Sequence, residues 1–379
     1  MNSRKKIVFL TGTRADFGKM RPLINIVKES DEFDYFIFVT GMHTLSKYGN
    51  TYVEVQKFLG NEYENYFVFM NQNESTDSDV ILTNTITGFG NFVKEINPDM
   101  IIIHGDRIEA LAGSIVGSFN NILVSHIEGG EISGTLDELT RHATTKLSHI
   151  HFVSNVDAKN RLLQMGENES SVFVIGSPDI EVMKSKNLPT YNEVKNYYEI
   201  PFDEYSIFIF HPVVSELSLL HEQIKHTIDA LIESNRNYIV IYPNNDSGSD
   251  IIINEFARLD NNEHFKIYPS VRFEYFLSML KNSKLILGNS SVGIRESEIY
   301  QIPSIDIGSR QKNRTNHPDI IHVNPQKNEI LEAINNAENK IVKCINSFGD
   351  GENTSKQFFD ILCDEKIWEI STQKQFVDI

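Results

Sequence analysis

The chain has 379 residues, a formal net charge of −17 at pH 7, and a composition that is 40% hydrophobic and 23% charged. This composition excludes a disordered chain, and the length exceeds one ordinary core, so two domains are expected. The acidic balance argues against nucleic acid or an anionic membrane as the main partner.

The sequence predicts a cytoplasmic protein without a metal site. No apolar run approaches the length of a membrane-spanning helix, and the apolar stretch 7–10 is too short for a signal peptide. The two cysteines, Cys344 and Cys363, suit a reducing compartment, and their spacing fits no metal-ligand pattern.

Strand and helix patterns alternate through the first half of the chain. After a first strand at 7–10, apolar residues recur at helical spacing at Met20, Leu23, Ile24 and Val27. Further strands are expected at 35–39, 100–104, 122–127, 151–153 and 172–175, and helices at about 80–95, 108–119 and 157–165. This alternation is typical of a doubly wound parallel sheet.

The alternation restarts after a polar stretch, with strands expected at 206–210, 238–242, 284–287 and 304–307 and a late helix at 329–337. We therefore expect an N-terminal α/β domain with catalytic carboxylates (1–183), a linker (184–205), a C-terminal α/β nucleotide-binding domain (206–350) and a tail helix that packs back (351–379). Two doubly wound parallel-sheet domains with an interdomain cleft form the glycosyltransferase-B type of architecture.

Acidic loops follow two of the buried strands. The first reads His104-Gly105-Asp106-Arg107, the second reads His126-Ile127-Glu128-Gly129-Gly130-Glu131, and Asp137 comes shortly after. Because parallel strands end at one edge of a sheet, these carboxylates converge in one pocket, where they suit proton transfer. Helix capping by Asp106, or by Asp137 after its Ser133-Gly134-Thr135 start, explains one or two of these acids but not the cluster. A lone histidine at such a strand end is more often structural.

Other loops suit a phosphate group. Gly12-Thr13-Arg14-Ala15-Asp16-Phe17-Gly18-Lys19 joins a strand to a helix, where backbone N–H groups bind anions; the alternative is a plain turn with a surface arginine. Gly288-Asn289-Ser290-Ser291 opens a helix in the same way, and Glu296 would reach ribose hydroxyls unless it is a solvent-facing residue behind a serine cap. His211, Pro243-Asn244-Asn245-Asp246 and Arg310 also follow strands, although Arg310 alone would be a surface residue. Together these loops predict a sugar-nucleotide site.

These motifs, in this order, resemble the UDP-N-acetylglucosamine 2-epimerases, and most of all their hydrolysing branch of bacterial sialic acid biosynthesis. The resemblance extends over nearly the whole chain, and the stretch Gly129-Gly130-Glu131-Ile132-Ser133-Gly134-Thr135 sides with the hydrolysing branch. It implies that Asp106, Glu128 and Asp137 are catalytic. It implies nucleotide contacts by Arg14, Arg107, His211, Asn244, Ser290, Ser291, Glu296 and Arg310. Further candidates are Lys19, His104, His126 and Glu131.

The implied reaction converts UDP-N-acetylglucosamine into N-acetylmannosamine and UDP, by elimination to 2-acetamidoglucal and then hydration. It needs no NAD or metal, and the family implies a homodimer or larger homo-oligomer. Proton removal from one face of C-2 and return to the other requires at least two acid/base groups, which accounts for several acids in one pocket.

Four alternatives stay open. The same reaction on GDP-N,N'-diacetylbacillosamine would serve legionaminic acid synthesis, and a non-hydrolysing epimerase would release UDP-N-acetylmannosamine. A retaining glycosyltransferase would use the same architecture, but the acid cluster exceeds what simple sugar transfer requires. A nucleotide-sugar sensor would bind UDP without turnover. The fold alone does not separate these functions.

Overall fold

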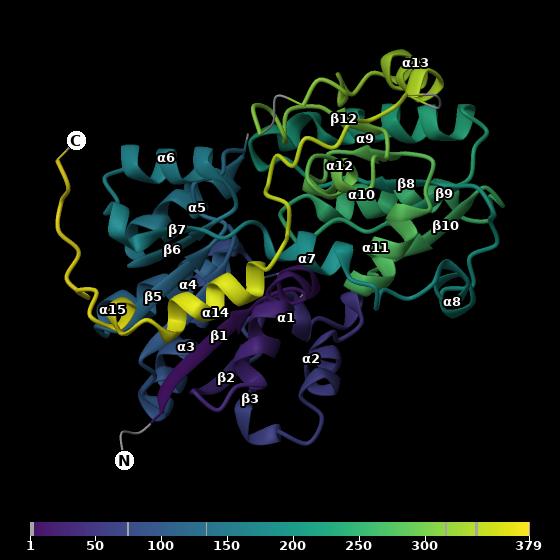
Figure 1. Ribbon diagram of the computed structural model, residues 1–379. Helices are drawn as coiled ribbons and strands as arrows, with labels where there is room; N and C mark the ends of the chain where they lie inside the picture. The colour runs from purple at the N-terminus through teal and green to yellow at the C-terminus, as the bar shows by residue number, and fades with distance from the viewer. Residues whose placement is uncertain (1–3, 74–75, 134, 315–316, 338–339, 379) are drawn as a thin grey trace. The chain divides into compact units, whose positions relative to one another are not determined.

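The computed structural model describes residues 4–73, 76–133, 135–314, 317–337 and 340–378 (Figure 1). The chain forms two compact units. Unit 1 contains the described residues of Met1–Glu131, Asp137–Lys184 and Phe348–Ile379, and unit 2 those of Ile132–Leu136 and Ser185–Ser347. In the part of the chain that the structure describes, no helix is both long enough and apolar enough to span a bilayer.

Unit 1 is built on a parallel sheet of seven strands in the order β3-β2-β1-β4-β5-β6-β7. The strands are β1 (Lys5–Thr11), β2 (Phe33–Val39), β3 (Tyr66–Val68), β4 (Met100–His104), β5 (Leu123–Ile127), β6 (Ile150–Val153) and β7 (Val172–Val174). The chain builds outward from β1 to one edge, returns to β4, and builds to the other edge. This reversal beside β1 is the position where doubly wound sheets bind ligands.

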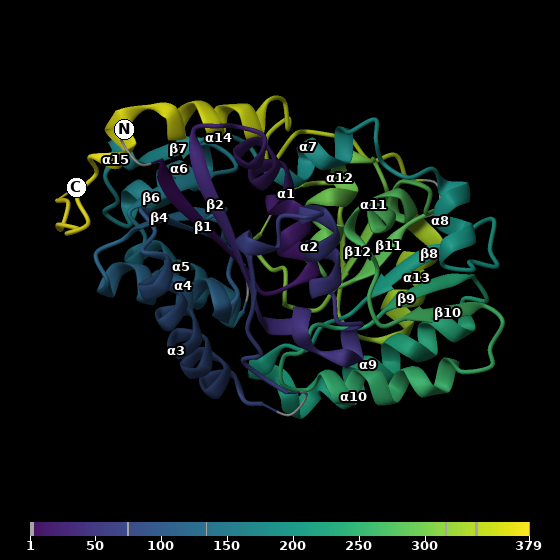
Figure 2. The same cartoon turned by 90° about the horizontal axis from the view of Figure 1, so that it is seen from below.

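Both faces of this sheet are covered, which is why its central strands are apolar throughout. Alternate residues of β1 face opposite ways: Ile7 and Phe9 join the core under α1 and α14, while Val8 and Leu10 join the core under α3 and α4 (Figure 2). The helices of this part are α1 (Arg14–Lys28), α2 (Tyr52–Leu59), α3 (Ser78–Ile96), α4 (Ile108–Phe119), α5 (Leu136–Leu147), α6 (Val156–Gln164), α7 (Pro178–Lys184), α14 (Thr354–Cys363) and α15 (Glu365–Trp368).

Unit 2 contains a parallel sheet of six strands in the order β10-β9-β8-β11-β12-β13, so its chain reverses between β8 and β11. The strands are β8 (Ser206–Ile209), β9 (Tyr238–Ile241), β10 (Phe265–Tyr268), β11 (Ile286–Gly288), β12 (Ser304–Ile307) and β13 (Ile321–Val323). One face carries α9 (Leu217–Glu233), α10 (Ser249–Phe256) and α13 (Lys327–Ala337). The other helices are α8 (Tyr191–Tyr197), α11 (Phe273–Lys281) and α12 (Glu296–Ile299).

The predicted pair of doubly wound parallel sheets is confirmed. The sequence did not indicate β3, β10 and β13, and all three are edge strands that are only partly buried. An edge strand lacks the apolar run of a strand buried on both faces, so its pattern is weak.

The stretch 184–205, expected to be a linker, contains a helix. Thr190 and Glu193 form a capping box at the start of α8, and the Tyr191 ring stacks on Tyr205 with ring centres 5.8 Å apart. From Ser185 onward the stretch groups with unit 2. The helix has seven mostly polar residues, so it carries no clear hydrophobic period.

Gly288 at the end of β11 should tolerate no side chain. Its φ is +128°, and a Cβ atom there would lie 1.8 Å from the backbone oxygen of Ile209. We expect Gly288→Ala to lower the free energy of unfolding by about 2 kcal/mol or more, measured by urea denaturation. Gly308→Ala is the matched control, because Gly308 has a φ of +88° but no atom within 4 Å of the added methyl group. Equal losses in the two variants would contradict the steric argument.

Candidate functional site

The loop after β4 directs Asp106 toward a buried arginine. Arg141, on α5, forms an ion pair with Asp106 through Nη2 and donates from Nη1 to the backbone oxygen of Glu131 at 3.1 Å. Burial disfavours the charged guanidinium, but the negative charges of Asp106, Glu131 and Asp137 outweigh it and raise the pKa of Arg141. Asp137 lies one helical turn before Arg141, so both face the same way.

Asp106 does not cap α4. The N-cap position belongs to Arg107, which makes no side-chain capping bond. The capping alternative for Asp106 is therefore wrong, and its carboxylate takes part in the Arg141 cluster instead. Arg107 Nε lies 3.7 Å from Glu109 Oε2.

His126 forms a hydrogen bond with the backbone of the same loop. The ring is fully buried; Nε2 lies 2.7 Å from the backbone oxygen of Gly105, and Nδ1 lies 3.1 Å from Thr145 Oγ1. Desolvation lowers the pKa of His126 to about 3, so the ring is neutral at physiological pH. Because a carbonyl oxygen only accepts, Nε2 carries the proton. His126 thus fixes Gly105, the residue before Asp106.

Glu128 stands at the end of β5 in a strained backbone conformation. Its φ is +64°, a region that costs a residue with a side chain roughly 1–2 kcal/mol. Ser177 donates to Oε1, while His104 Nε2 and Lys19 Nζ lie 3.3 and 4.0 Å from Oε2. The side chain is 7% exposed. These contacts fix the direction of the carboxylate.

Glu131 and Asp137 are the other two acidic residues that the sequence placed at this edge. Glu131 is buried, and Oε1 accepts from Ser154 Oγ at 3.2 Å. Asp137 is partly buried in the first turn of α5. Gly134, in the start sequence expected before that helix, lies outside the described residues.

The first backbone N–H groups of the loop after β1 already bind a carboxylate of the chain itself. The carboxylate of Asp16 accepts from Gly12 N at 2.9 Å, Thr13 N at 3.0 Å and Thr11 Oγ1 at 2.5 Å. The expectation that the first backbone N–H groups of this loop bind a phosphate is therefore wrong for Gly12 and Thr13. Arg14 Nη2 forms an ion pair with Glu54 Oε1 at 2.8 Å.

In unit 2, Asn289 joins the ends of β8 and β11. Its Oδ1 accepts from His211 N at 2.6 Å, and its Nδ2 donates to His211 O at 2.8 Å. Asn244 N donates to His211 Nδ1 at 3.1 Å, which leaves the ring proton of neutral His211 on Nε2. The backbone oxygen of Asn289 also accepts from Arg310 Nη1 at 3.4 Å and Gln311 Nε2 at 2.9 Å. The buried Asn289 thus links the backbone of His211 to the side chain of Arg310, two of the residues expected to hold a nucleotide.

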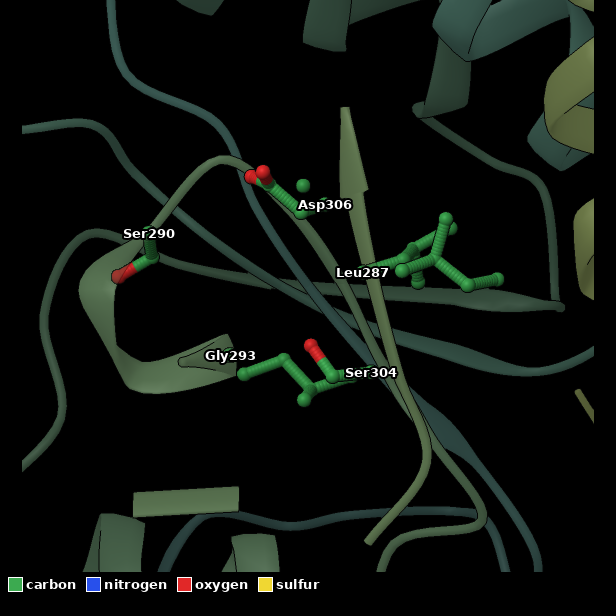
Figure 3. A pocket seen from close by; sticks show the side chains of 8 residues that line it. Leu287, Ser290, Gly293, Ser304 and Asp306 are labelled. Carbon is green, nitrogen blue, oxygen red and sulfur yellow. The ribbon is translucent and has the colours of Figure 1, made fainter. Parts of the chain in front are cut away.

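A short 3-10 turn, Ser291–Gly293, follows, and the Ser290 hydroxyl accepts from Val292 N at its start. Beside it lies a small pocket, which is lined by Ser290 before the turn, by Gly293 in the turn, and by Ser304 and Asp306 of β12 (Figure 3). Asp306 is buried, and its Oδ2 lies 2.9 Å from His322 Nδ1. This hydrogen bond raises the pKa of His322. Glu296, one of the expected ribose contacts, is buried in α12.

The sequence did not single out Arg141, Ser177 or Asp179, and it included Asn289 in the Gly288-Asn289-Ser290-Ser291 motif without giving it a role of its own. Arg141 follows Asp137 by one helical turn, and Ser177 and Asp179 follow β7 at the edge that carries the acids. These positions in the sequence are the signal that could have identified them as neighbours of the acidic residues. Among the described residues, no group of three or more His, Cys, Asp or Glu side chains is arranged to hold a metal ion.

The chain is similar to known proteins along nearly its whole length. The family model described as UDP-N-acetylglucosamine 2-epimerase matches residues 25–363. The UDP-N-acetylglucosamine 2-epimerase of Neisseria meningitidis serogroup B is 43% identical over 379 residues, with 99% of each chain covered. The UDP-N,N'-diacetylbacillosamine 2-epimerase (hydrolyzing) of Legionella pneumophila is 33% identical over 360 residues, covering 94% of this chain and 95% of the relative.

Solved structures share the fold. The UDP-GlcNAc 2-epimerase of Methanocaldococcus jannaschii, in complex with UDP-GlcNAc and UDP, superposes with a TM-score of 0.76 at 23% sequence identity. The superposition covers 94% of this chain and 99% of that one.

The buried neutral His126 should make the protein less stable in acid. Its pKa is lowered from 6.5 to about 3 by burial, so the unfolded chain binds a proton that the folded chain does not. Below pH 6.5 this group should reduce the free energy of unfolding by about 1.4 kcal/mol per pH unit. We expect His126→Asn to flatten the stability–pH slope by about one proton between pH 4 and 6 in urea titrations. His221→Asn, at a side chain 72% exposed, should leave the slope unchanged.

Proposed function

Because this chain belongs to the UDP-N-acetylglucosamine 2-epimerase family, we propose that it is a hydrolysing epimerase that converts UDP-N-acetylglucosamine into N-acetylmannosamine and UDP. The observation that carries the proposal is the pair of carboxylate clusters at one edge of the unit 1 sheet. One holds Asp106 and Asp137 around Arg141, and the other holds Glu128 beside His104 and Lys19.

The first step is an elimination. The C1–O bond of the sugar breaks, its electron pair leaves with UDP, and a carboxylate takes the proton from C-2, which forms the C1–C2 double bond of 2-acetamidoglucal. The N–H of His211 Nε2, the guanidinium of Arg310 and the turn at Ser290 stabilise the charge on the leaving diphosphate. We assign Asp106 and Glu128 to this step.

The second step is a hydration. Water adds its oxygen to C-1 and gives one proton to a carboxylate, while a carboxylic acid delivers a proton to C-2 on the face opposite to the one that lost it. This inversion needs an acid/base group separate from the one that removed the proton, so several carboxylates at one sheet edge suit it. We assign Asp137 to this step.

The hydrolysing outcome is supported by the similarity to the Legionella relative, whose name includes hydrolysis. We favour UDP-N-acetylglucosamine as the substrate, because the Neisseria relative, which is named for that sugar nucleotide, is 43% identical to this chain. The Legionella relative is 33% identical. The second candidate, a diacetamido sugar nucleotide, rests on the latter similarity.

Proton NMR in D₂O with UDP-N-acetylglucosamine tests the proposal. Free UDP together with N-acetylmannosamine deuterated at C-2 is the expected result. UDP-N-acetylmannosamine would instead make the chain a non-hydrolysing epimerase. Turnover only of a nucleotide-linked diacetamido sugar would keep the mechanism and change the substrate.

Asp106→Asn should lower turnover about 100-fold or more, the usual scale for loss of a general acid or base. The affinity for UDP, measured by calorimetry, should stay within about twofold, since unit 2 carries the proposed diphosphate contacts. Glu138→Gln is the matched control, because Glu138 neighbours Asp137 on α5 but pairs with His142 at 3.5 Å. Near-wild-type turnover in Asp106→Asn would refute the role of Asp106.

A further inference from the structure

Lys19 lies between two buried carboxylates. Its Nζ is 3.0 Å from Asp179 Oδ2 and 4.0 Å from Glu128 Oε2. The side chains of Lys19, Asp179 and Glu128 are 11%, 1% and 7% exposed. The shorter contact is to Asp179, which has no part in the proposed proton transfers. An ammonium group in this position can be shared between the two acids.

A three-residue stretch at the start of α7 contacts both partners. Ser177 donates its hydroxyl to Glu128 Oε1, and Asp179, two residues on, pairs with Lys19. The stretch is fixed from outside, because Ser177 N donates to Phe348 O at 3.1 Å. Gly349 packs so closely there that a Cβ atom would lie 2.8 Å from the Cα atom of Gly176. Asp179 therefore has little freedom to follow Lys19.

We propose that Asp179 is a positioning residue that holds the Lys19 ammonium away from full pairing with Glu128. The role of Glu128 as a base rests on the proposed function. Two carboxylates and one ammonium together carry one net negative charge. The shared ammonium therefore does not fully neutralise Glu128, which can still accept a proton. If Asp179 were neutral, Lys19 would pair with Glu128 alone, stabilise its ionised form and occupy the lone pair that takes the C-2 proton.

Several elements bring groups close to Glu128. His104 ends β4, Lys19 lies on α1, and Ser177 directly precedes α7, whose Asp179 pairs with Lys19. Asp179→Asn changes the charge of one of these groups with little change in volume. The variant therefore tests the charge rather than the packing.

The test is a pH titration of the Glu128 carboxyl carbon by NMR in ¹³C-glutamate-labelled protein, with the signal assigned by Glu128→Gln. In Asp179→Asn we expect the titration midpoint of Glu128 to fall by about one pH unit or more. The rate of C-2 deuterium exchange should fall at least tenfold, its acid limb should move to lower pH, and UDP affinity should be unchanged. Asp179→Glu, which keeps the charge, should restore part of the rate.

Glu181→Gln is the matched control, because Glu181 lies on the same helix but accepts from Ser355 N and Oγ at 2.7 and 2.6 Å. An unchanged Glu128 midpoint in Asp179→Asn overturns the proposal, whatever the activity. If the wild-type protein exchanges no proton at C-2, the proposed function fails, while the Glu128 titration still decides the positioning role.

If Asp179→Asn does not fold, Lys19→Gln replaces it in ¹³C-aspartate-labelled protein. Loss of the ammonium should move the Asp179 midpoint up by about one pH unit or more. No movement would overturn the proposal.

Discussion

The buried guanidinium of Arg141 is what allows the acidic loops of unit 1 to exist at the end of an apolar sheet. Carboxylates removed from water are costly unless they are paired, and breaking such a pair costs about 3–5 kcal/mol. Arg141 is 1% exposed, pairs with Asp106 and binds the backbone of Glu131, so one side chain connects the loops after β4 and β5. The position of α5, and with it Asp137, follows from the same contact.

The two units connect the loops at the edges of their sheets by different kinds of interaction. In each unit the chain reverses next to candidate site loops, between β1 and β4 in unit 1 and between β8 and β11 in unit 2. Unit 1 joins its loops by charge, through Arg141. Unit 2 joins them by neutral hydrogen bonds, since both polar ends of the Asn289 amide bind the backbone of His211.

The sequence predicted the central strands and the acids that follow them, because strands buried on both faces have apolar runs that end abruptly. It could not predict partners that depend on tertiary packing. Asp16 is an instance: the spacing suggested an open anion loop, but a carboxylate four residues after Gly12 reaches back to its backbone N–H. Asp179 is another, since its pairing with Lys19 joins residues 160 positions apart. Edge strands such as β13 were missed because half-exposed residues show no apolar run.

The two carboxylate clusters differ in the kind of cation that compensates them, and this difference bears on the chemistry. Arg141 keeps its charge at every accessible pH, so Asp106 has a constant partner. Glu128 is flanked instead by the imidazole of His104 and the ammonium of Lys19. A cation beside a carboxylate favours the ionised form, which is the form that accepts a proton. Two such environments at one sheet edge match a reaction that removes a proton and then returns one.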